Sequence, residues 1–381
     1  MPFFLVLLTA ILSHTAFKGT RVLVALDALA LGANPALLGV LFALFAVLPV
    51  FLALPAGRFA DRVGSRRPML IGTAGLATGL VACYVLPGLP TLFVAVAAIG
   101  GCYVFYTVSI QMLVGSLGAA EGRTRRYGHF SLAIAATAML GPVVAGLAID
   151  GVGHRLAYLV LAALAAAAGL TVWHSGRHLP RPAPRPEPAG ARKGRGLPSR
   201  PLLAVLLVSG IIETGMELFN FYVPIYGNSI GLSATRIGIV LGCFGGAMLL
   251  ARSLIPVLTR RMREERLIAA GLTVGALVAV AFPFVETFAL LCAMAVGFGL
   301  GLGWCTPLAM ALTYNRAPEG RAGEAMGMRQ IVNKSTEVMV PMVFGSIGAV
   351  FGVAPAFWLD AVMLAAGALI MRRSARGRPG A

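Results

Sequence analysis

The first apolar segment of this sequence carries three basic side chains at helical spacing. His14, Lys18 and Arg21 are four and three residues apart, so on a helix of about 3.6 residues per turn they share one face. Lysine and arginine in such positions can hold an anionic group, and histidine can exchange a proton near neutral pH. The stripe therefore predicts anion binding, proton transfer or both.

A matching stripe lies 199 residues further along the chain and is acidic. Glu213, Glu217 and Asn220 repeat the spacing of the basic residues one by one. Two interpretations stay open. The basic residues neutralise the acidic ones in a structural salt bridge, or they hold an anionic substrate while a carboxylate or His14 exchanges protons. A carboxylate whose cation is taken over by a substrate would take up a proton.

A third polar face is expected in the segment 326–349. Arg329, Asn333 and Glu337 are spaced by fours, and Lys334 lies in an adjacent row with Gln330. Each charge at mid-bilayer costs about 2.5–3.5 kcal/mol, so these side chains must face water or one another. Further charged residues inside apolar segments are Asp27, Arg252 and Asp360, of which the two aspartates lie nearer the outer helix ends and are candidate gate residues.

The composition of the chain indicates that these polar residues are carried by membrane-spanning helices. Of the 381 residues, 58% are hydrophobic and 12% charged, about half the charged fraction of a soluble domain. A bilayer core needs about 20 apolar residues per helix. We expect an all-α fold of twelve spans, at 3–30, 36–56, 69–86, 91–117, 128–149, 155–173, 202–227, 235–258, 267–285, 287–314, 326–349 and 354–371.

The segment 174–201 separates the spans into two groups of six. Its proline and arginine content favours an extended, solvated linker. We therefore expect a six-helix bundle over 1–173, the linker, and a second six-helix bundle with a short basic tail over 202–381. The five cysteines lie in apolar stretches without a paired motif and indicate neither disulfides nor a metal site.

The basic residues predict the orientation in the membrane. With the N-terminus in the cytoplasm, most of the 31 lysines and arginines fall in cytoplasmic segments. These segments are 57–68, 119–128, 174–201, 259–266, 315–325 and the tail after Met371. We expect a multi-pass protein of the cell membrane with both termini cytoplasmic and with basic loops facing anionic lipids. No basic stripe alternates with aromatic residues, so the net charge of +17 does not indicate nucleic-acid binding.

An internal repeat supports the division into two halves. The same offset of 199 residues aligns several glycines and prolines without a gap. Among the aligned pairs are Gly39 with Gly238, Gly100 with Gly299, Pro142 with Pro341, and Gly146 with Gly345. Two similar six-helix halves typically bind substrate near the midplane between the repeats.

The connection at 57–67 reads G-R-F-A-D-R-V-G-S-R-R. It resembles the signature loop G-x-x-x-D-R-x-G-R-[RK] of the major facilitator superfamily of secondary transporters, with Ser65 where a basic residue is usual. The number of spans, the central linker and the repeat extend the resemblance over essentially the whole chain. The resemblance implies a twelve-helix fold and alternating access.

The resemblance also implies gating residues in this loop. Asp61 and Arg62 would change partners as the transporter changes state, Gly57 and Gly64 would allow close backbone approach, and Arg66 belongs to the same motif. The alternative is a solvated basic loop that serves topology alone. In the second half, Pro256, Arg260 and Arg261 replace the corresponding motif residues, so a symmetric latch there should be weak or absent.

Two further positions bear on the direction of transport. Gly141 and Pro142 begin an element similar to the GPxxGG motif of antiporter branches, with Thr137 in place of the leading glycine. Plain helix packing is the alternative. Gln111 stands where many exporters of the family carry an arginine. The glycine–proline element favours export, and the glutamine at position 111 weakens the case for export. Together they leave a slight preference for export.

The function expected from these features is secondary active transport of a small organic ion, anionic or zwitterionic, coupled to protons. The alternatives within this class are an uptake permease and a lipophilic-drug efflux pump. The alternatives from other functional classes are a non-transporting sensor or scaffold and an intramembrane enzyme. No HExxH, GxSxG or phosphate-loop motif is present, so we expect no enzyme, cofactor or metal. The resemblance implies a monomer.

Overall fold

The computed structural model describes residues 3–117, 123–175, 199–318 and 322–376, and within these residues the only regular elements are helices. The chain divides into two compact units. Unit 1 comprises 1–33, 44–195 and 233–238, and unit 2 comprises 34–43, 196–232 and 239–381. Most of the expected linker 174–201 lies outside the described residues, and the expected bundles 1–173 and 202–381 stay a prediction.

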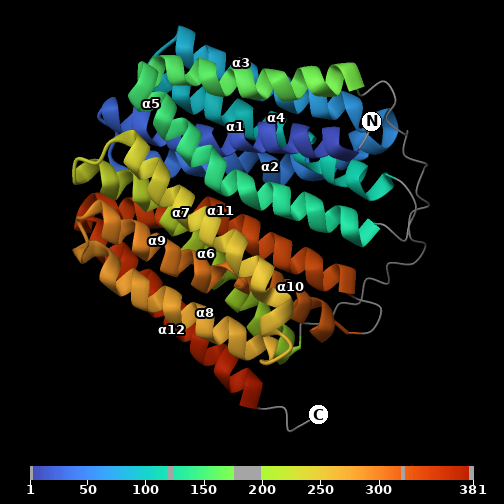
Figure 1. The fold of residues 1–381 in the computed structure, drawn as a ribbon, viewed down its shortest axis with the longest axis vertical. Coiled ribbons are helices and arrows are strands. Elements are labelled where there is room, and N and C mark those ends of the chain that lie inside the picture. Colours follow the sequence, from blue (N-terminus) through green and yellow to red (C-terminus); the bar gives the residue numbers. More distant parts are fainter. Residues whose placement is uncertain (1–2, 118–122, 176–198, 319–321, 377–381) are drawn as a thin grey trace. The chain divides into compact units, whose positions relative to one another are not determined.

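Unit 1 is built from the first five helices (Figure 1). They are α1 (Phe3–Ala30), most of α2 (Pro35–Val63), α3 (Arg66–Val85), α4 (Leu89–Ser116) and α5 (Arg123–Ser175). α1 packs along α5, and α3 packs against α4 and α5. The crossing of α1 and α5 is close, because a Cβ on Gly141 would lie 2.6 Å from the Cβ of Lys18 and 2.9 Å from the backbone nitrogen of Gly19.

The long helix α5 contains two of the expected spans. Gly153 interrupts it with φ 81° and ψ 162°, a backbone conformation that glycine adopts without strain. The chain therefore reverses direction between the expected spans 128–149 and 155–173 with almost no loop.

Unit 2 contains the remaining helices. They are α6 (Arg200–Ser229), most of α7 (Ala234–Leu258), α8 (Glu264–Ala281), the 3-10 turn η3 (Phe282–Phe284), α9 (Phe288–Gly303), α10 (Cys305–Arg316), α11 (Ala322–Phe351) and α12 (Val353–Arg376). α6 packs against α10, α11 and α12, while α8 packs against α9 and α12. The expected span 287–314 is divided at Trp304 into α9 and α10.

Among the described residues, ten helical segments are long and apolar enough to cross a membrane, with α9 and α10 counted together as Phe288–Arg316. One of them, α5, covers two expected spans, and the expected span in α11 is not among the ten. Helix α11 is more polar than these ten because it carries Arg329, Lys334 and Glu337. The prediction of an all-α integral membrane fold is confirmed.

The internal repeat is visible in two close helix crossings, each inside one unit. In unit 1, the first turns of α7 pack on α5, where Gly238 lies on the carbonyl of Pro142 and Gly146 on that of Ala234. In unit 2, the first turns of α2 pack on α11, where equivalent residues make the same contacts. The contacts there are Gly39 on the carbonyl of Pro341 and Gly345 on that of Pro35. All four contacts obey the offset of 199 residues.

Candidate functional site

A polar cluster in unit 2 joins α6 to α11. The amide nitrogen of Asn333 donates a hydrogen bond to Glu213 Oε2 at 3.3 Å, and the hydroxyl of Ser209 donates to Asn333 Oδ1 at 2.9 Å. Arg329 Nη1 lies 3.5 Å from the Ser209 hydroxyl. Ser209, Arg329 and Asn333 are buried, whereas Glu213 is half-buried. The spacing of four between Arg329 and Asn333 therefore does place both against α6.

Two guanidinium groups accompany Glu213. Arg252 of α7 and Arg329 of α11 both interact electrostatically with this carboxylate. Arg252 Nε also donates to the backbone carbonyl of Gly303 at 3.4 Å, where α9 ends. A carboxylate within electrostatic range of two cations on different helices is a centre where an anionic ligand could compete for the cations.

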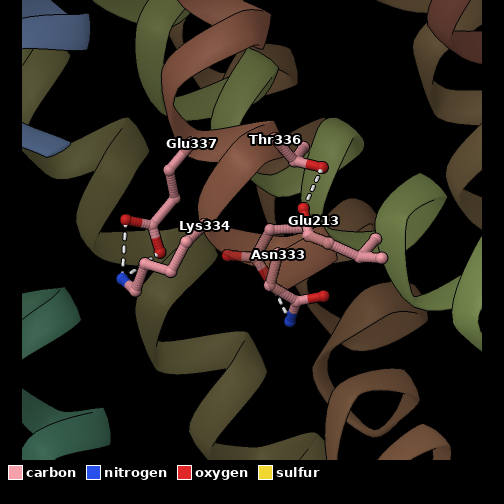
Figure 2. A network of polar contacts seen from close by, with 6 residues as sticks. Glu213, Asn333, Lys334, Thr336 and Glu337 are labelled. Atoms are coloured by element: carbon pink, nitrogen blue, oxygen red, sulfur yellow. Dashed lines mark hydrogen bonds and ion pairs between the residues drawn. The ribbon is translucent and has the colours of Figure 1, made fainter. Parts of the chain in front are cut away.

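Glu337 is not part of this cluster. Lys334 Nζ lies 2.6 Å and 2.7 Å from its two carboxylate oxygens, and the lysine side chain is 46% exposed. Figure 2 shows this pair on one side of α11 and Glu213 with Asn333 on another. The difference from the expected face arises because a residue three positions away on the same helix reaches the carboxylate directly.

The other acidic-stripe residues on α6 have different surroundings. Glu217 is buried, with 6% of its surface exposed. Asn220 is half-buried, and its side chain donates to the backbone carbonyl of Met216 at 2.7 Å within α6. Within the cluster around Glu213, the sequence did not single out Ser209, a serine on an apolar helix with no distinguishing signal. The Thr306 hydroxyl lies 3.6 Å from the sulfur of Met216.

In unit 1, His14 lies in an aromatic environment. Its ring meets Tyr103 and Tyr106 of α4 edge-on, with centroids 5.6 Å and 5.7 Å away. Its Nδ1 lies 3.0 Å from the carbonyl of Ala10. The hydroxyl of Tyr106 is buried without a hydrogen-bond partner among the described residues. Tyr103 and Tyr106 are thus the aromatic neighbours of His14.

Three aromatic side chains of unit 2 donate hydrogen bonds to the backbone. The Tyr222 hydroxyl donates to the carbonyl of Phe344, the Tyr226 hydroxyl to two backbone carbonyls after α8, and Trp304 Nε1 to the carbonyl of Leu267 at 3.0 Å.

The basic stripe of α1 lies along the same helix face as expected. Lys18 and Arg21 are half-buried, and the Lys18 Cβ lies against Gly141 where α1 crosses α5. They belong to unit 1, whereas Glu213 and Glu217 belong to unit 2. Gln111 of α4 is exposed.

The loop between α2 and α3 has an anchor inside unit 1. Arg66 Nη2 donates to the carbonyl of Trp173 at 2.9 Å, and the guanidinium lies 5.1 Å from the centre of the Trp173 ring. Gly64 has φ 80°, a conformation that favours glycine. Gly57, Asp61 and Arg62 lie in α2, which continues to Val63, so the part of the expected loop before Gly64 is helical. Asp61 and Arg62 are exposed and Gly57 is half-buried. Arg66 therefore holds the start of α3 to the end of α5.

Two further polar contacts were not predicted. In unit 2, Arg316 of α10 and Glu265 of α8 form a buried salt bridge of 2.7 Å, and Arg316 Nη1 also donates to the carbonyl of Pro201 at 3.2 Å. In unit 1, the carboxylate of Asp150 accepts hydrogen bonds from the first backbone N–H groups of α7, at 3.1 Å and 2.8 Å. Both Glu265 and Asp150 look like loop residues in the sequence.

The sequence profile of the Major Facilitator Superfamily matches residues 6–338. The chain belongs to the major facilitator superfamily. Its relatives include the tetracycline resistance protein, class C, of Escherichia coli, 25% identical over 87% of this chain and 84% of the relative. Human solute carrier family 67 member A1 is 24% identical over 85% of this chain and 80% of its own length.

A solved transporter structure has the same fold. A POT family transporter in complex with 5-aminolevulinic acid superposes with a TM-score of 0.82 at 12% identity, covering 97% of this chain and 95% of the other. The chain is therefore a multi-pass membrane protein of a transporter family and not an enzyme.

Proposed function

We propose that this chain is a secondary active transporter that moves a small organic ion, anionic or zwitterionic, out of the cell by alternating access and in exchange for protons. The observation that carries the proposal is the cluster around Glu213. One carboxylate interacts with Arg252 and Arg329 and accepts a hydrogen bond from Asn333. Intramembrane charges are costly enough that such a concentration is typical of substrate and ion pathways.

Competition for the guanidinium groups would couple the substrate to protons. While Arg252 and Arg329 interact with Glu213, the ionised carboxylate is favoured. An anionic substrate group that binds the arginines would withdraw that support and favour the protonated acid. Substrate binding would therefore be accompanied by proton uptake at Glu213.

The proposal that transport is outward rests on two features. Gly141 and Pro142 form part of an element that resembles an antiporter motif, and a relative covering most of the chain is named a tetracycline resistance protein. That relative also makes efflux of a lipophilic drug the second candidate function.

A thermal-shift screen of the purified protein tests the substrate class. Glutamate and citrate represent zwitterions and anions, and tetraphenylphosphonium and tetracycline represent the second candidate. A ligand at 100 times its dissociation constant stabilises by about 2.7 kcal/mol. We expect glutamate-like or citrate-like compounds to raise the melting temperature, with the effect lost in Arg329→Gln and Arg252→Gln but kept in Arg260→Gln, whose side chain is exposed.

The proton-coupling step needs a second measurement with any compound that stabilises the protein. In proteoliposomes, its transport should change the internal pH, and Glu213→Gln should abolish the pH change. Glu286→Gln is the matched control, because Glu286 is an exposed carboxylate of the same unit. Stabilisation by the lipophilic compounds alone would overturn the proposed substrate class, and an unchanged pH response in Glu213→Gln would overturn the role of Glu213.

A further inference from the structure

Asp360 of α12 is a buried carboxyl group that no part of the proposed function uses. Its side chain has no exposed surface, and neither carboxylate oxygen has a hydrogen-bond partner among the described residues. It lies seven residues after the start of α12, about 10 Å along the helix. Asp360 is thus enclosed by protein, away from the solvated helix ends.

The surroundings of Asp360 are apolar and closely packed. Its Oδ2 faces Gly215, midway along α6, where an added Cβ would lie only 3.5 Å away. Leu302 and Leu364 pack on the same glycine. One turn earlier on α12, Phe357 stacks on Phe282 with ring centroids 4.6 Å apart. The Asp360 carboxyl group therefore packs against α6 among apolar side chains.

The ionisable groups of α6 do not neutralise Asp360. Glu213 and Glu217 are two residues before and after Gly215, about 200° around the helix, so they lie on the opposite face. Tyr222 shares the face of Gly215, but it is two turns further along, and its hydroxyl donates to Phe344.

The charged residues of the other helices packed on α12 are also accounted for. On α8 they are Glu264, Glu265 and Arg266, in the first turn and at least nine residues before Gly275, which packs on Leu364. On α11, Arg329 belongs to the Glu213 cluster, and Lys334 pairs with Glu337. On α12 itself, Arg372 is three turns away and donates to Thr273 at 3.2 Å.

An ionised carboxylate without a partner is very costly in such an environment, whereas a neutral acid costs far less. We propose that Asp360 is a proton-binding site of unit 2, distinct from Glu213, and that its bound proton stabilises the packing of α12 on α6. The site takes a proton from water and returns it when the carboxyl group becomes hydrated. This proposal needs neither the substrate nor the role of Glu213 to be correct.

The pH dependence of thermal unfolding tests the site without a substrate. In the wild type, the unfolded chain releases the proton of Asp360 above about pH 4, while the folded protein keeps it. The folded state then binds more protons than the unfolded state, so its stability falls as the pH rises. Asp360→Asn carries no proton to lose, so its melting temperature should rise relative to the wild type by about 5 °C between pH 5 and pH 8.

Two further variants make the test decisive. Asp360→Ser is a second neutral side chain and should show the same pH-dependent difference, so the result does not depend on the folding of one variant. Asp27→Asn is the comparison variant at a membrane carboxyl group that has a partner, because Asp27 accepts a hydrogen bond of 2.7 Å from the Tyr158 hydroxyl.

An infrared spectrum provides an independent reading. The wild type at pH 6 should show the carbonyl absorption of a protonated carboxylic acid that is missing in whichever Asp360 variant folds. A melting-temperature difference that stays constant from pH 5 to pH 8, or an unchanged carbonyl absorption, would overturn the proposal. Because neither measurement uses a ligand or Glu213, failure here leaves the proposed transport function untouched.

Discussion

At the scale of single residues, burial decides how much an ion pair contributes to the stability of the folded protein. Arg316 and Glu265 are paired with 2% and 9% of their side chains exposed, whereas Lys334 and Glu337 are paired with 46% and 25% exposed. Removing one partner of a buried pair leaves an uncompensated charge. An exposed pair is weakened by solvent and contributes little.

Glu265→Gln should therefore destabilise the protein strongly. We expect a loss of about 3–5 kcal/mol because Arg316 would remain buried without its counter-charge. The measurement is the melting temperature of the purified protein in detergent. Lys334→Gln is the matched control and should cost less than about 1 kcal/mol; equal losses in the two variants would contradict the argument from burial.

At the scale of helices, glycines set how closely the elements cross. A Cβ on Gly146 would lie 2.9 Å from the Cα of Thr235 and nearer still to the carbonyl of Ala234. Both atoms belong to the backbone, so no side-chain rotation relieves the contact. By contrast, Gly151 in the same helix has no atom within 4 Å of an added Cβ.

Gly146→Ala and Gly151→Ala should consequently differ in their effect on the stability of the protein. We expect Gly146→Ala to cost about 1–3 kcal/mol through overpacking, and Gly151→Ala to be neutral or slightly stabilising because alanine favours the helix. Thermal unfolding of both variants checks this. A Gly146→Ala protein as stable as the wild type would mean that the crossing of α5 and α7 can shift without cost.

The position of the first turn of α7 depends on Asp150 as well as on Gly146. Its carboxylate accepts hydrogen bonds from two N–H groups that have no partner within the helix. We expect Asp150→Ala to cost about 1 kcal/mol, as the loss of a helix cap does, and Asp150→Asn to cost less because an acceptor remains. Melting temperatures that follow the order wild type, Asn, Ala would support the capping role, and equal values for all three would contradict it.

At the scale of the whole molecule, the distribution of basic residues predicts the orientation in the membrane. Arg236 lies in the first turn of α7, and Arg260 lies two residues beyond the other end of that helix. Both are exposed. They should therefore face opposite sides of the membrane, with Arg260 in the cytoplasm.

Cysteine labelling in intact cells tests this orientation. In a chain whose five cysteines are replaced by serine or alanine, Arg236→Cys should react with a membrane-impermeant maleimide added outside. Arg260→Cys should react only after the membrane is permeabilised. The reverse pattern would mean that the termini lie outside the cytoplasm.

Properties that depend on local sequence were predictable. Apolar length and composition predicted the helices, because a lipid environment requires each backbone to satisfy its own hydrogen bonds. The loop at 57–67 and the repeat identified the family, and the offset of 199 residues anticipated the equivalent crossings at Gly39 and Gly238.

Only the tertiary structure decided which polar groups meet and which remain alone. Sequence spacing placed Glu337 with Arg329, but the carboxylate pairs with Lys334, since rotamers and neighbouring helices determine where a long side chain ends. Asp360 resembled an outer-end residue until the packing of α6, with Gly215 opposite it, showed a carboxyl group enclosed by apolar side chains. Spacing along one helix gives the face of a residue, whereas its partners depend on the helices that cover that face.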